Sequence, residues 1–153
     1  MRLVYVDNDP VVTAHVRALL VTGDGDAAVA ADLADPASVL ADPAWRGLID
    51  MAEPVCLIFG LVLSLMPARQ AREVVAAYAD RAAPGSYVVI SCGRCDDQAL
   101  WKQLSEAYTA ARAWNHARRT IAGFLGGLEL IPPGLVPVQK PDGGGRTAVA
   151  VTT

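Results

Sequence analysis

Short apolar runs alternate with segments of helical periodicity over most of the chain. Four runs predict strands: Leu3–Val6, Ala27–Asp32, Val55–Leu63 and Tyr87–Ile90. The segments between them carry apolar residues three and four positions apart, as helices with one buried face do. The unbroken apolar character of Val55–Leu63 favours the centre of a parallel sheet covered on both faces. This alternation predicts an α/β domain.

Aspartate followed by proline marks several helix starts, because aspartate caps a helix and proline suits its first position. Asp9-Pro10 begins a helix in which Val12, Val16, Leu19 and Leu20 recur at helical spacing. Asp35-Pro36 and Asp42-Pro43 predict two short helices within residues 36–50. Three further helices are expected after Pro67, from Asp96 to about Trp114, and from Arg118 to Leu125.

The alternation of predicted strands and helices stops in the last part of the chain. Leu128–Ile131, Leu135–Val138 and Thr147–Thr152 read as strands, and their short proline- and glycine-rich connections permit hairpins but no crossover helix. We therefore predict a single three-layer domain over residues 1–153, with a mostly parallel sheet that ends in an antiparallel hairpin.

Composition excludes several classes. The chain is 53% hydrophobic with a net charge of −3, which argues against disorder and against a nucleic-acid partner. Its longest apolar stretch, Val55–Met66, is too short to span a membrane. Met1 leads directly into a predicted strand, so we expect no signal peptide. Three cysteines, an odd number, favour a reducing cytoplasm over a disulfide framework.

Ligands of open α/β sheets bind beyond the carboxyl ends of the strands. Asp7, Asn8 and Asp9 follow the first strand, where Asp7 either accepts hydrogen bonds from ribose hydroxyls or satisfies turn amides, and Asp9 is the cap. At the end of the second strand, Asp32 either meets an exocyclic amine, with Leu33 against an aromatic base, or belongs to a turn.

Two later segments invite a functional interpretation. At Phe59-Gly60, glycine either lets a ligand approach the backbone or permits close helix packing. Cys92 and Cys95 form a CxxC pair between a strand and a helix, where redox chemistry would need a depressed thiol pKa. The favoured interpretation is that Cys92 and Cys95 are two small residues that close a turn. No metal site is expected, because neither histidine is near the pair in sequence.

The opening Leu3–Val12 resembles the start of a response-regulator receiver domain. A working receiver needs an acidic phosphoacceptor after its third strand, and Val55–Met66 contains no acid. It also needs a lysine after its last strand, whereas the chain has only Lys102 and Lys140. A degenerate receiver, acting as a non-enzymatic binding or regulatory domain, is therefore the alternative hypothesis.

A second resemblance covers Leu3 to about Val138. Its segments are Val4–Val12, Ala31–Pro36, Pro84–Ser91, Phe124–Leu130 and Pro133–Val138. Together they resemble a bacterial S-adenosylmethionine-dependent methyltransferase family first catalogued as a domain of unknown function. The resemblance implies a class I methyltransferase-like (Rossmann-like) fold, S-adenosyl-L-methionine as cofactor, and methyl transfer to an acceptor that the sequence does not identify.

The same resemblance implies the cofactor contacts. Asp7, with Asn8 beside it, would hold the ribose hydroxyls, and Asp32 and Leu33 would contact the adenine. The segment around Phe59 and Gly60 would lie near the methyl-donor side. Methyl transfer needs mainly proximity and alignment, so no catalytic base is implied.

The chain departs from that family in several places. Family members carry a further segment before this point, with the first strand and a glycine-rich loop for the methionine part of the cofactor. We therefore expect a truncated, incomplete domain with impaired cofactor binding, whose exposed sheet surface favours a homodimer. Ser64 stands where a histidine is usual, and Ala34 where an arginine is usual.

Overall fold

The computed structural model describes residues 1–107, 112–137 and 146–152, the last of these as backbone. The chain forms two compact units, Met1–Glu53 and Pro54–Thr153, which we describe separately. The sequence pattern did not predict this division, and the single domain expected over residues 1–153 stays a prediction.

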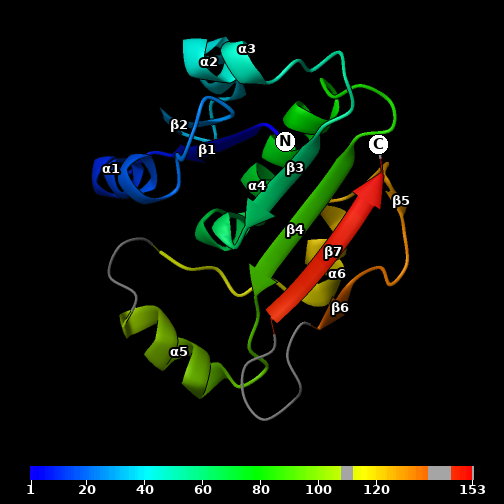
Figure 1. The fold of residues 1–153 in the computed structure, drawn as a ribbon. Helices are drawn as coiled ribbons and strands as arrows, with labels where there is room; N and C mark the ends of the chain where they lie inside the picture. The colour runs from blue at the N-terminus through cyan, green and yellow to red at the C-terminus, as the bar shows by residue number, and fades with distance from the viewer. Residues whose placement is uncertain (108–111, 138–145, 153) are drawn as a thin grey trace. The chain divides into compact units, whose positions relative to one another are not determined.

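The first unit is a two-stranded parallel sheet with three helices. β1 (Leu3–Asp7) pairs with β2 (Asp26–Ala30), and α1 (Pro10–Leu19) connects them (Figure 1). α2 (Pro36–Ala41) and α3 (Pro43–Leu48) follow. The three helices are capped by the predicted aspartates, Asp9, Asp35 and Asp42, each with a proline directly after it. The predicted helix starts are therefore confirmed.

The apolar side of α1 is more exposed than the periodicity suggested. Val12 is 40% exposed, and Leu19 and Leu20 are 69% and 47% exposed. This face borders a hollow of about 260 Å³ lined by Val11, Val12, His15, Val16, Leu19 and Leu20. Periodicity therefore located the helix correctly but did not show which part of its apolar face is covered.

The second unit is built on a mixed sheet. β3 (Cys56–Gly60) runs parallel to β4 (Tyr87–Gly93), and β4 pairs antiparallel with β7 (Arg146–Thr152). The short strands β5 (Glu129–Leu130) and β6 (Val136–Pro137) also pair antiparallel with β7. The antiparallel C-terminal strands are therefore confirmed.

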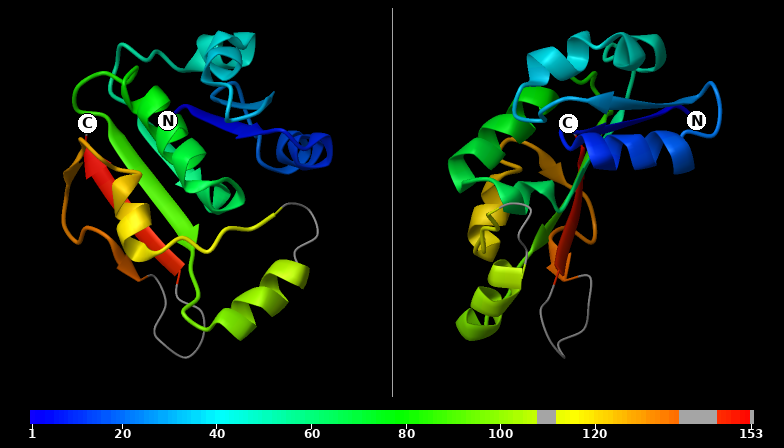
Figure 2. Two further views of the ribbon diagram at one scale, coloured as in Figure 1. Left: turned by 180° about the vertical axis from the view of Figure 1, so that it is seen from behind. Right: turned by 90° about the vertical axis from the view of Figure 1, so that its left-hand side faces the viewer.

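Helices of the second unit gather on one face of its sheet. α4 (Ala68–Ala79) and α6 (Arg118–Gly123) lie on the same face, as Figure 2 shows, and the Arg72 Nε–H donates to the carbonyl of Gly123 across them at 3.1 Å. The buried apolar side chains of this unit include Leu57, Phe59, Leu63, Val74, Val75, Tyr78, Val88, Ile90, Ile121 and Phe124. Ile58, which alternates with Leu57 and Phe59 along β3, is 68% exposed. Cover on both faces of this strand, and hence three layers, stays a prediction.

Two predicted elements end earlier than expected. The strand expected to reach Leu63 stops at Gly60, because Leu61 turns the chain into the short 3-10 helix η1 (Val62–Leu65). The helix expected from Asp96 to Trp114 is α5 (Gln98–Ala107); residues 108–111 lie outside the described part, and residues 112–114 are not helical.

Candidate functional site

The first candidate group lies where β1 ends. Asp7 is the last residue of β1, is half-buried, and accepts the Asp9 N–H on Oδ1 at 2.8 Å. Asp9 accepts N–H groups of Val11 and Val12 at 2.7 and 3.4 Å, as a cap does. The buried Thr13 hydroxyl donates to the Asp9 carbonyl at 2.9 Å, which fixes the turn. Asp7 therefore serves the turn with one hydrogen bond, and a carboxylate has acceptor capacity for more.

The end of β2 lies beside it in the same sheet. Asp7 is opposite Ala30 in the strand register, and the Ala31 N–H donates to the Asp7 carbonyl at 3.1 Å. Asp32 follows at once, is exposed, and accepts the Ala34 N–H on Oδ1 at 2.8 Å. The carboxylates of Asp7 and Asp32 thus belong to two adjacent strand ends at one edge of one sheet.

Asn8 and Leu33 complete this group. The exposed Asn8 directly follows β1, and the half-buried Leu33 directly follows Asp32. The structure therefore brings four of the six predicted residues to the carboxyl edge of the β1–β2 sheet. Carboxylates can accept hydrogen bonds from ribose hydroxyls and a base amine, and an aliphatic side chain can pack on the base. This combination of acceptors and one apolar side chain fits a nucleoside.

The other two predicted residues, Phe59 and Gly60, lie in the second unit. The Phe59 ring is 3% exposed and meets the ring of Tyr78 edge-on, with the centroids 5.9 Å apart. A ligand contact at Phe59 is therefore restricted to the backbone. A Cβ placed on Gly60 would meet no atom within 4 Å, so helix packing does not require this glycine. The open space at Gly60 agrees with the ligand interpretation, which stays a prediction.

Leu61, which the sequence analysis did not single out, has an unusual backbone. Its φ of 62° and ψ of −15° are left-handed, a conformation that costs a leucine about 1–2 kcal/mol. Its N–H donates to both the carbonyl and the hydroxyl oxygen of Ser91, each at 3.0 Å. Residue type gives no signal for this turn, because glycine and asparagine, not leucine, are typical of it.

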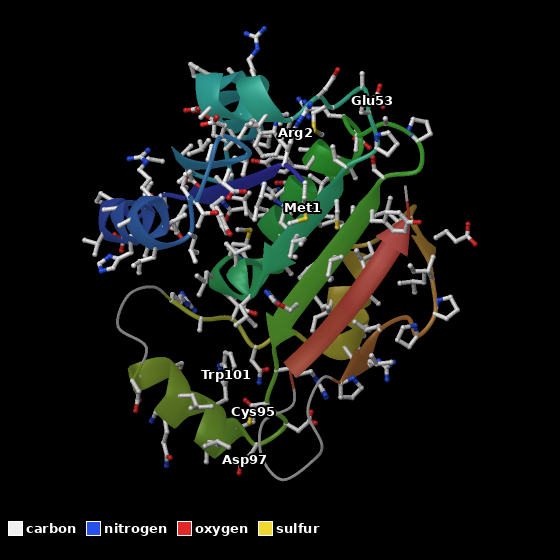
Figure 3. All side chains as sticks on the ribbon, viewed as in Figure 1. Met1, Arg2, Glu53, Cys95, Asp97 and Trp101 are labelled. Carbon is white, nitrogen blue, oxygen red and sulfur yellow. The ribbon has the colours of Figure 1, made fainter. Side chains whose placement is uncertain are left out.

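The CxxC pair lacks the electrostatics of a redox site. Cys92 and Cys95 are both buried free thiols, and Cys95 lies between β4 and α5 (Figure 3). Burial raises the pKa of the Cys92 thiol to about 11, although a hydrogen bond with Ser64 acts in the opposite direction. A raised pKa is the reverse of what thiolate chemistry needs. The structure thus agrees with the favoured interpretation, a turn closed by small residues.

Thiol labelling checks this assignment. At pH 8 we expect iodoacetamide to alkylate the exposed Cys56 and to leave Cys92 unmodified, since a raised pKa keeps Cys92 protonated until the pH approaches about 11. Intact mass should show one added group in the native protein and three in urea. A Cys56→Ser variant should show none until it is unfolded. Rapid native labelling of Cys92 would contradict the assignment.

The described residues contain no helix long and apolar enough to cross a membrane. Within the same residues, no three His, Cys, Asp or Glu side chains are placed to share a metal ion.

Comparison with known proteins identifies the relatives of this chain. Residues 1–151 match the family described as S-adenosyl methyltransferase. The chain belongs to the S-adenosyl methyltransferase family. This confirms the resemblance seen in the sequence, and the receiver alternative is not favoured. The cofactor of this family is S-adenosylmethionine.

Solved structures agree with the family match. A candidate methyltransferase from Thermobifida fusca is 29% identical with a TM-score of 0.83, covering 99% of this chain and 63% of its own. A DUF574 family protein from Streptomyces avermitilis is 26% identical with a TM-score of 0.87, covering 99% and 65%. This chain therefore spans less than two thirds of the length of these two relatives.

More distant structures share the fold. The N-methyltransferase NodS from Bradyrhizobium japonicum, in complex with S-adenosyl-L-homocysteine, is 15% identical with a TM-score of 0.63 and covers 99% of this chain and 66% of its own. The methyltransferase-like fold with mostly parallel strands is confirmed. No curated protein matches the sequence.

Proposed function

We propose that this chain binds S-adenosylmethionine and takes part in methyl transfer to an acceptor whose identity the chain does not reveal. One observation carries the proposal. In a member of this family, Asp7 ends β1, and Asp32 lies two residues beyond the end of β2. The two strands are adjacent and parallel, and both residues lie at the edge where α/β sheets bind ligands.

The roles of the residues follow from their chemistry. Asp7, with Asn8 beside it, would accept hydrogen bonds from the ribose hydroxyls. Asp32 would accept from the adenine amine, and Leu33 would pack on the base. The backbone at Phe59 and Gly60 would lie on the methyl-donor side, where the empty space at Gly60 lets a ligand come close.

S-adenosylmethionine supplies a methyl group on a sulfonium, which is electrophilic without help from a base. The protein's task is then to hold the cofactor and the acceptor in line, so that the acceptor's electron pair forms the new bond to carbon as the carbon–sulfur bond breaks. This agrees with a predicted site made of binding residues, in which no catalytic acid or base is assigned.

Impaired cofactor binding remains a proposal from the departures seen in the sequence. A homodimer and a cytoplasmic location remain proposals from the sequence. The homodimer is supported by Ile58 on β3, an apolar side chain that is 68% exposed.

Isothermal titration calorimetry tests the proposal directly. S-adenosylhomocysteine, the stable demethylated product, should give saturable heat with a dissociation constant on the order of micromolar. Adenosine should bind more weakly, and homocysteine alone should give no heat. The absence of heat at millimolar S-adenosylhomocysteine would overturn independent cofactor binding by this chain.

A further inference from the structure

We propose that two copies of this chain pair along the outer edge of β3, as antiparallel strands centred on Ile58. The inference rests on the proposed homodimer and deepens it, and it uses residues of the second unit alone. It begins from the place of β3 in its sheet. The strand order is β3-β4-β7-β5, so β3 is an outer strand, and no residue that the structure describes in the second unit pairs with its other edge.

The outer edge of β3 presents the backbone groups of three residues. Alternate residues of a strand bond to the neighbouring parallel strand. The Val55 carbonyl accepts an N–H of β4 at 2.8 Å, and the Leu61 N–H donates to a carbonyl of β4 at 3.0 Å. The odd-numbered residues of this segment therefore bond to β4, and the N–H and C=O groups of Cys56, Ile58 and Gly60 lie on the outer edge.

This arrangement is symmetric about the middle of the strand. Cys56, Ile58 and Gly60 are the first, third and fifth residues of β3. When two copies run antiparallel with Ile58 opposite Ile58 of the second copy, Cys56 is opposite Gly60 of that copy. Each opposed pair exchanges two hydrogen bonds, so every N–H and C=O on the two outer edges finds a partner. Such self-complementarity is what a two-fold interface requires.

The side chains of β3 favour the same pairing. The segment Cys56–Gly60 contains no charged residue and no proline, and its register with β4 runs without a bulge. Charges, prolines and bulges are the features that protect outer strands from pairing. Ile58, at the centre, is 68% exposed, and the two copies of its side chain would cover each other. The second copy therefore brings no like charge to the interface and buries an exposed apolar residue.

Sedimentation velocity tests whether the chain dimerises through this edge. An interface made by one pair of strands is small, so we expect a dissociation constant on the order of 10–100 μM. Ile58→Lys places a charge at the centre of the interface and should leave the chain monomeric throughout this range. The matched control is Leu104→Lys, which adds the same charge at a 50% exposed position of α5 and should dimerise as wild type does. Equal melting temperatures of the two variants will show that Ile58→Lys is folded.

Disulfide formation tests the register. In the proposed pair, the Cα atoms of the two copies of residue 58 are about 5.5 Å apart, within the range of a disulfide. Those of the two copies of Cys56 are separated by four positions along the strands, about 13 Å. After air oxidation, Ile58→Cys combined with Cys56→Ser should run as a disulfide-linked dimer. Wild type, which keeps the exposed thiol of Cys56, should not.

The outcomes separate this interface from the other proposals. A wild-type chain that stays monomeric at about 500 μM would overturn the inference together with the homodimer. Dimerisation of Ile58→Lys as strong as that of wild type, or equal disulfide formation through Cys56, would overturn this interface alone. Both measurements are made without ligand, because Gly60 also borders the proposed cofactor position. Calorimetry with S-adenosylhomocysteine decides cofactor binding independently of either result.

Discussion

Replacing Asp7 by alanine is expected to abolish calorimetric binding of S-adenosylhomocysteine, with an affinity at least about a hundredfold below that of wild type. Hydrogen bonds to a charged group are stronger than neutral ones, and a ribose with two hydroxyls presents two donors to one carboxylate. Asp7 is half-buried at the end of β1, and its hydrogen bond from Asp9 N–H holds it there. The carboxylate therefore needs little reorganisation to receive the ligand.

Two further variants separate recognition from the turn. Asp7→Asn keeps an oxygen for the Asp9 N–H but loses the charge, so its affinity should fall between those of wild type and Asp7→Ala. Asp42→Ala removes another aspartate of the same unit, the cap of α3, whose Oδ1 accepts the Ala44 N–H at 2.8 Å. It should lower helix stability by about 1 kcal/mol and leave binding intact. Wild-type affinity in Asp7→Ala would refute the ribose assignment.

Local signals predicted the first unit well. Aspartate followed by proline combines a side-chain cap with a preset φ, and each such pair begins a helix at the expected residue. The same locality explains the site. Asp7 is the last residue of β1, and Asp32 lies two residues beyond the end of β2. Predicting parallel pairing of those strands was therefore enough to predict that both residues lie at one edge.

Prediction was weaker where tertiary structure decides the outcome. Val55–Leu63 is apolar at every position but Gly60, so its sequence could not show that Leu57 and Phe59 face the core while Ile58 is exposed. Nor could the end of the strand be found, because the reversal at Leu61 depends on Ser91, thirty residues away. The division after Glu53 likewise depends on contacts that no local pattern reports.

The burial of Phe59 leads to the largest expected change in stability. Phe59→Ala should lower the free energy of unfolding of the second unit by about 3–5 kcal/mol, because it removes a ring that is 3% exposed and leaves a cavity beside Tyr78. Urea unfolding followed by circular dichroism would measure it. The neighbouring Ile58→Ala, at an exposed position, should change stability by no more than about 0.5 kcal/mol. If Phe59→Ala unfolded like Ile58→Ala and instead lost affinity for S-adenosylhomocysteine, the ring would be a ligand contact and its placement in the core would be wrong.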